Sequence, residues 1–206
     1  SAFLPYGAIV FLAGCLMIAH VYAVSLEMAL IAIVLILTIA ILYYGFKPGD
    51  SYLMVLTPLA FLLKIPYVVP LLVGLGGSLA SVIPVGCGVF LYYLLIYVKQ
   101  NAGILAASDG SVDIVQKYSQ ILKSVLFNQT MMVMIATCAV GIIVVYLIRR
   151  LSMDYAWVVA IVAGSVAELL AIFVGDFVFG VSVSVGPMIL GLVLSAAIAA
   201  VFNFFV

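Results

Sequence analysis

Long apolar runs separated by short polar breaks dominate the chain. A membrane-spanning helix needs about 20 mostly apolar residues. Runs of this kind cover residues 4–24, 28–46, 130–148, 155–174 and 188–206. They are continuous, whereas the strands of a membrane β-barrel alternate between apolar and polar residues. Since only helices or closed barrels satisfy every backbone polar group in lipid, the pattern predicts an all-α, polytopic helical membrane protein.

Residues 52–98 are apolar too, but they contain four prolines and five glycines, and Lys64 lies in their middle. Proline removes a helical hydrogen bond and clashes with the preceding turn. One interpretation is a kinked helix over 53–73, a Gly-Gly-Ser turn and a helix over 83–98. The other is a re-entrant or broken pair around residues 64–83, which is tolerated only where protein or water covers it. We prefer the two kinked helices.

This choice decides the number of transmembrane helices and their orientation. Two kinked helices give seven spans, whereas a re-entrant segment gives six. With seven spans most lysines lie on the side of the N-terminus, which predicts that this side is cytoplasmic. With six spans the charge bias nearly vanishes.

Residues 99–127 form the one long polar interval of the chain, and residues 111–126 have helical amphipathicity. Lysines opposite an apolar face are typical of a helix that lies in the membrane interface. The residues that define this helix include Val115, Lys117, Tyr118, Leu122 and Lys123. It could lie on lipid, on its own bundle or on a partner subunit. The interval divides one membrane domain into a Pro/Gly-broken part, residues 1–98, and a three-helix part, residues 128–206.

Small residues recur at helical spacing in the last two spans. Such faces let neighbouring helices approach closely. The residues that form them are Ala160, Gly164, Ala171 and Gly175 in one span, and Gly191, Ser195 and Ala199 in the other. The second ridge is suited to packing against the first. Glu168 lies on the edge of the first face, which predicts that it points into the bundle.

Composition excludes several classes of protein. The chain of 206 residues is 69% hydrophobic and 7% charged, whereas soluble domains are about 45–50% apolar and about 25% charged. The formal net charge of zero provides no basic surface for nucleic acid. One histidine and three cysteines, each cysteine inside an apolar run, show no metal-binding spacing. We therefore expect no metal and no cofactor.

Three ionisable residues fall in or near apolar runs: Lys64, Glu168 and, nearer the interface, Asp176. Such residues are costly at membrane depth and are candidates for function by default. One hypothesis is that Lys64 and Glu168 pair, or line a polar cavity, and bind a solute or relay a proton. The simpler interpretation, which we prefer from sequence, is that Lys64 snorkels to the interface and Glu168 is a neutral, hydrogen-bonded acid that locks helices.

The sequence shows no enzyme signature, so we expect a non-enzymatic multi-pass membrane protein. The first expectation is a transporter-like protein, or the membrane subunit of a transport complex, that handles a small solute or lipid. The second is a structural or assembly protein that recruits partner subunits, or further copies of itself, through its amphipathic helix and small-residue faces. A lipid-modifying enzyme with its site at Asp50 or Asp176 comes third. The expected location is the cytoplasmic membrane of a prokaryote.

Overall fold

The computed structural model describes residues 6–24, 26, 29–30, 32–37, 50, 52–106, 123–152, 155–180 and 185–205. Every regular element in these residues is helical, which confirms the all-α part of the predicted fold class. The elements are α1 (Tyr6–Val24), α3 (Tyr52–Leu62), α4 (Val68–Gly76), the 3₁₀ helix η2 (Leu79–Ser81), α5 (Val82–Ala106), α7 (Gln129–Arg149), α8 (Ala156–Phe179) and α9 (Val185–Phe205).

Three helical stretches are long and apolar enough to cross a membrane: Leu79–Gln100, Lys123–Arg149 and Ala156–Phe179. Shorter apolar helices cover Phe11–Ala23, Tyr52–Leu62 and Gly186–Phe202. These helices indicate a membrane protein. The six or seven spans expected from the sequence stay a prediction.

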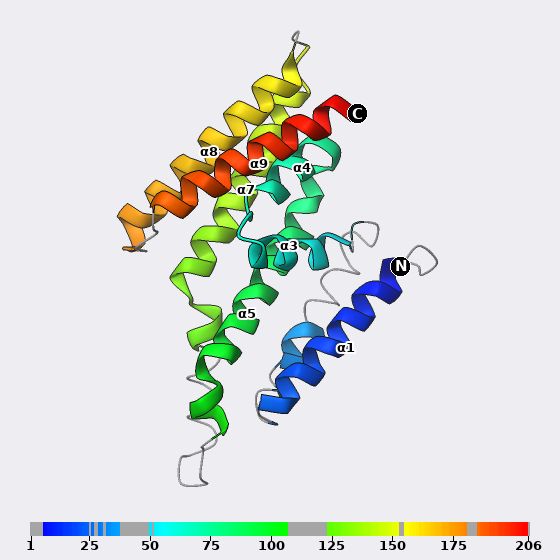
Figure 1. Ribbon diagram of the computed structural model, residues 1–206, viewed down its shortest axis with the longest axis vertical. Helices are drawn as coiled ribbons and strands as arrows, with labels where there is room; N and C mark the ends of the chain where they lie inside the picture. Colours follow the sequence, from blue (N-terminus) through cyan, green and yellow to red (C-terminus); the bar gives the residue numbers. More distant parts are fainter. Residues whose placement is uncertain are drawn as a thin grey trace.

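Helices α7, α8 and α9 form one half of the molecule, where α7 and α8 pack against each other and α9 runs along α8 (Figure 1). Helix α1 lies on the opposite side of the molecule, against α3 and α5. The short helix α4 lies between these two halves and contacts α3, α7, α8 and α9. The late helices and the Pro/Gly-rich segment therefore share one core.

The segment that contains Lys64 is broken, and the continuous kinked helix expected over 53–73 does not form. Helix α3 ends in a Schellman motif, in which the Lys64 amide donates to the Phe61 carbonyl at 3.1 Å and the Ile65 amide to the Ala60 carbonyl at 3.0 Å. Lys64 has a left-handed φ of 61°. Pro66 then disfavours helix for the residue before it, so the chain turns before α4 begins.

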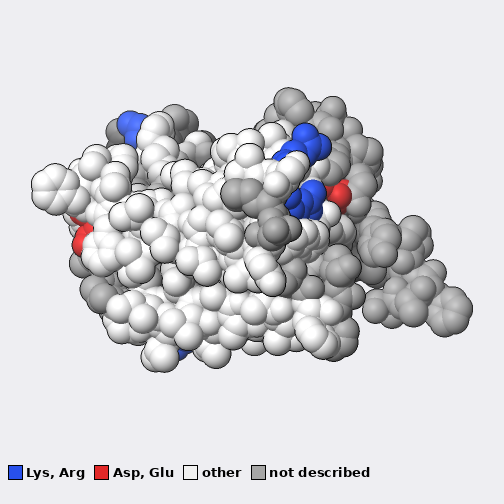
Figure 2. Space-filling model, turned by 90° about the horizontal axis from the view of Figure 1, so that it is seen from above, with Lys and Arg blue, Asp and Glu red and all other residues white. Residues whose placement is uncertain are grey.

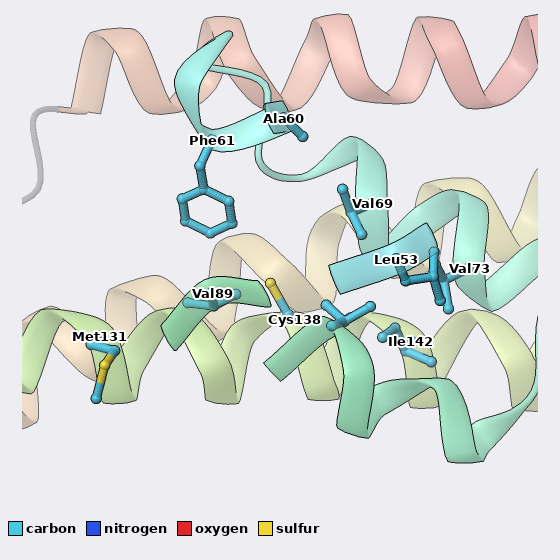
Figure 3. Packing of buried hydrophobic residues seen from close by; sticks show 10 residues of the cluster. Leu53, Ala60, Phe61, Val69, Val73, Val89, Met131, Cys138 and Ile142 are labelled. Atoms are coloured by element: carbon cyan, nitrogen blue, oxygen red, sulfur yellow. The ribbon is translucent and has the colours of Figure 1, made fainter. Parts of the chain in front are cut away.

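Helix α4 is buried except on one face, where Leu72 is half-buried and Gly76 is exposed, as expected of a short apolar helix inside a bundle. Its buried residues are Val68, Val69, Pro70, Leu71, Val73, Gly74 and Leu75. Val69 and Val73 pack with residues of α3, α5 and α7 in one cluster, which includes Cys138 and Ile142 of α7 (Figure 3). Leu71 and Leu75 pack in a second cluster with residues of α7, α8 and α9.

The outer surface of the late helices is apolar. Phe177 of α8 is 94% exposed and Phe204 of α9 is 87% exposed. Figure 2, which shows the molecule from above, places the charged side chains of the described residues in only a few small patches. Since exposed apolar area of this extent is rare on soluble monomers, lipid is the solvent that fits this surface.

Most of the predicted interfacial helix, residues 111–122, lies outside the described residues, as do Val115, Lys117, Tyr118 and Leu122. Residues 123–126 are helical, with Lys123 exposed. Val125 is buried and packs with Val21, Leu94 and Val98. The last turn of the predicted helix therefore contacts the protein's own bundle.

Candidate functional site

One face of α8 is built from small residues, and this face is turned inward. Ala160, Gly164 and Gly175 are buried, and Ala171 is half-buried. The opposite face is exposed and consists of larger apolar side chains, including Val162, Val166, Leu170, Phe173 and Phe177. Large apolar side chains therefore cover the outer face of α8, and the small residues of its inner face let neighbouring helices approach its backbone closely.

Helices α7 and α8 run antiparallel and interlock through glycines. Side chains of α7 fill the space that two glycines of α8 leave: Val133 lies over Gly175, and Val145 lies over Gly164. Between these two pairs the arrangement is reversed, since a side chain of α8, Glu168, lies over Gly141 of α7. We call these three pairs the glycine seam. It places an acid at the centre of the α7–α8 contact.

Glu168 is completely buried, with 0% of its side chain exposed. Within the described residues, neither of its carboxyl oxygens has a hydrogen-bond partner. A Cβ built on Gly141 would lie 2.5 Å from Oε1 and 2.9 Å from Cγ, so the α7 backbone lies directly against the carboxyl group. The hydrogen-bonded helix lock expected from the sequence is therefore not what these residues form.

The neighbourhood of Glu168 contains two further titratable side chains. Glu168 interacts electrostatically with Tyr67, in the turn before α4, and with Cys138 of α7. Tyr67 packs with Ile172 of α8 and Met188 of α9. Tyr67 has a hydroxyl group and Cys138 a thiol, which is a weak donor, and neither side chain supplies a cation for the carboxyl group.

The buried hydroxyl groups nearby are already used within their own helices. Thr137 donates to the Val133 carbonyl at 2.8 Å, and Ser165 donates to the Ile161 carbonyl at 2.9 Å. Such bonds one turn back satisfy a hydroxyl group inside a helix. These donors are therefore not directed at Glu168.

The structure does not bring the three ionisable candidates together. Lys64 is exposed in the turn after α3, whereas Glu168 is sealed within the bundle. Asp176 is half-buried and lies about 12 Å further along α8, given a rise of about 1.5 Å per residue. Of the candidate set, Glu168 alone occupies the core.

The small-residue ridge of α9 is also turned inward, because Gly191, Ser195 and Ala199 are buried. Gly191 lies against the turn before α4: a Cβ there would be 3.3 Å from the Lys64 carbonyl oxygen and 3.3 Å from the Tyr67 ring. Ala199 packs with α4, α7 and α8 residues. The ridge therefore packs against the broken α3–α4 segment as well as against α8.

Asp50 has a local structural partner, since the buried hydroxyl group of Ser81 in η2 donates to its carboxylate. No group of three or more His, Cys, Asp or Glu side chains within the described ranges is suited to a metal ion. An open apolar groove of about 420 Å³ lies between α5 and α7 and contains neither Glu168 nor Asp50. Its lining residues are Leu35, Val82, Ile83, Gly86, Cys87, Phe90, Leu126 and Ile135.

Sequence reasoning found Glu168 but missed what surrounds it. Gly141 falls in a group of small residues in the middle of an apolar run, and that local dip in side-chain volume was the available signal. Tyr67 gave a weaker one, as a hydroxyl-bearing ring directly after Pro66. The chain as a whole matches no protein-family model, no curated protein and no solved structure.

Proposed function

We propose that this chain is a transporter-like membrane protein, or the membrane subunit of a transport complex, in which Glu168 is the group that binds and releases the transported or coupling species. The observation that carries the proposal is a fully buried carboxyl group without a hydrogen-bond partner among the described residues. A buried, unpaired polar group costs free energy, and ionisable groups inside membrane bundles are characteristic of ion and proton pathways.

The broken α3–α4 segment supports the same function. Discontinuous helices within membrane proteins commonly form transport sites, because they place turns and helix ends at membrane depth. Here the turn between α3 and α4 carries Tyr67, which packs with Ile172 of α8, one turn from Glu168. A helix break and a buried acid thus meet in one region of the bundle.

The alternative, a structural or assembly protein, has less support. It requires small-residue faces that are free to receive a partner helix. In this chain Gly164, Gly175 and Gly191 are all in contact with other parts of the same chain. The proposal includes six or seven spans, an interfacial helix within residues 111–126 and the cytoplasmic membrane of a prokaryote as its location.

Uptake into proteoliposomes tests the proposal. A panel of radiolabelled amino acids, sugars, organic cations and inorganic ions would be offered across an imposed pH gradient. We expect at least one solute to accumulate with the wild-type protein and with Lys64→Met, which alters an exposed turn, but not with Glu168→Gln. Equal uptake by wild type and Glu168→Gln, or no uptake of any member of the panel, would contradict the proposal.

A further inference from the structure

We infer that the species bound by Glu168 is a proton, and that α7 and α8 must separate at Gly141 for that proton to leave. The inference rests on the proposed function, because it takes Glu168 as the loaded group of a transport protein. It names the chemical class of the ligand and the place where the bundle opens.

The space around the carboxyl group excludes larger ligands in the packed state. The α7 backbone at Gly141 is so close to Oε1 that even a methyl group does not fit between them. A sodium or calcium ion requires several further oxygen ligands. The nearby Thr137 and Ser165 hydroxyl groups instead donate to carbonyl groups of their own helices. A proton needs neither volume nor extra ligands.

The electrostatic environment of Glu168 also favours a proton as the ligand. An isolated carboxylate inside a low-dielectric interior carries a very large desolvation cost unless a cation or several donors compensate it. The elements packed against α8 provide few charged groups. Helices α4 and α9 contain no titratable side chain, the turn before α4 contributes Tyr67, and α7 contributes Cys138, Tyr146 and Arg149. Arg149 lies at the far end of α7, against Tyr146 and Trp157.

Loading therefore joins a proton from water to a carboxylate oxygen and forms an O–H bond. Release breaks that bond and returns the proton to water, without any change of oxidation state. The carboxylate that remains requires water or donors, which the packed glycine seam does not offer. Release is thus coupled to separation of α7 from α8, and Gly141 is the point at which water first reaches the acid.

Infrared difference spectroscopy on the full-length protein in liposomes tests the identity of the ligand. We expect the carbonyl stretch of a protonated carboxyl group at neutral pH, shifted in heavy water and absent in Glu168→Gln. The spectrum should be the same in sodium, potassium and choline chloride. A band that is absent from the wild type, that persists in Glu168→Gln, or that disappears when sodium replaces choline would overturn the inference.

Cysteine labelling tests the opening. In a Cys15→Ser, Cys87→Ala background, Cys138 is the one remaining thiol of the three, and it is buried one turn from Gly141. We expect N-ethylmaleimide to label it at similar rates with and without Glu168→Gln at acidic pH. At alkaline pH the rate should be about tenfold higher with Glu168, which corresponds to about 1.4 kcal/mol of opening free energy. Identical pH profiles would overturn the coupling.

The two experiments separate this inference from the proposed function. If no solute is taken up but the infrared band is present and depends on Glu168, the proton site stands and the transport function fails. If uptake depends on Glu168 but the band disappears in sodium, transport stands and the proton is the wrong ligand.

Discussion

The α7 backbone at Gly141 lies directly against the side chain of Glu168 on α8, with no room for a Cβ between them. A glycine is therefore required at this position by its neighbour rather than by its own backbone conformation. In this pair, Gly141 is needed for close packing and Glu168 is the proposed functional group. Substitutions at each residue test these two roles.

Gly141→Ala should destabilise the protein by about 1–3 kcal/mol, because overpacking a close contact forces side chains and backbone to shift. The measurement is thermal unfolding in detergent, followed by circular dichroism. The matched control is Gly86→Ala on α5, where a Cβ would lie 3.7 Å from its nearest neighbour, the side chain of Ile135. That change should be neutral or stabilising, since alanine is the better helix former. Equal effects of both changes would contradict the close contact.

Glu168→Met should raise the unfolding temperature while abolishing the activity proposed above. The substitution replaces a carboxyl group that has no hydrogen-bond partner in the described part of the chain by an apolar side chain of similar volume, which removes a penalty of about 1–3 kcal/mol. Loss of stability in this variant would indicate that Glu168 has partners that stabilise it. A variant that is more stable than the wild type but inactive is the result expected when a residue serves activity at the cost of stability.

Gly164→Ala should also destabilise the bundle, by about 1–3 kcal/mol. The added methyl group would collide with Val145 of α7 and approach Leu71 of α4. Val145→Ala in the same chain should recover part of the loss, because it removes the side chain that the new methyl group meets. A double-mutant cycle measures this coupling directly. Additive effects of the two substitutions would contradict a contact between Val145 and residue 164.

Lys64→Gly should stabilise the protein by about 1 kcal/mol, because a left-handed conformation is strained for residues other than glycine. Lys64→Ala removes the same charge but keeps the strain, so its unfolding temperature should stay near that of the wild type. The comparison separates the backbone role of this position from its charge. A gain in both variants would show that the ammonium group itself is unfavourable there.

Arg149→Gln should alter the fluorescence emission of Trp157, the one tryptophan of the chain. The Arg149 guanidinium lies 5.8 Å from the centre of the Trp157 ring and 5.7 Å from that of Tyr146. Loss of these cation–π contacts should cost about 0.5–1 kcal/mol. Arg150→Gln is the control, because Arg150 stacks on Tyr146 and not on Trp157. Emission that is unchanged in Arg149→Gln would contradict the contact.

The sequence predicted the helical class because apolar run length is a local property. The last three runs, expected at 130–148, 155–174 and 188–206, lie within or close to α7, α8 and α9. Helix α8 continues beyond the expected end at residue 174 because Gly175 packs against Val133 instead of breaking the helix. Gly180, with φ 63°, provides the actual end.

The break after α3 and the surroundings of Glu168 were harder to predict, for two different reasons. Proline marks both kinks and ends of helices, and the Schellman motif here has lysine where glycine is usual, so its sequence signal is missing. The pairing of Gly141 with Glu168 depends on the register between two helices. Neither residue carries information about that register on its own.

The position of helix α4 has a consequence for the order in which the parts of the protein reach their final packing. Its nine residues are about 14 Å long at about 1.5 Å per residue, too short to be inserted as a span by itself. Helices α3 and α5 cover part of it, and the rest of the surface that buries it comes from α7, α8 and α9, all of which leave the ribosome later. The N-terminal half therefore reaches its final packing only after the C-terminal helices are synthesised and inserted.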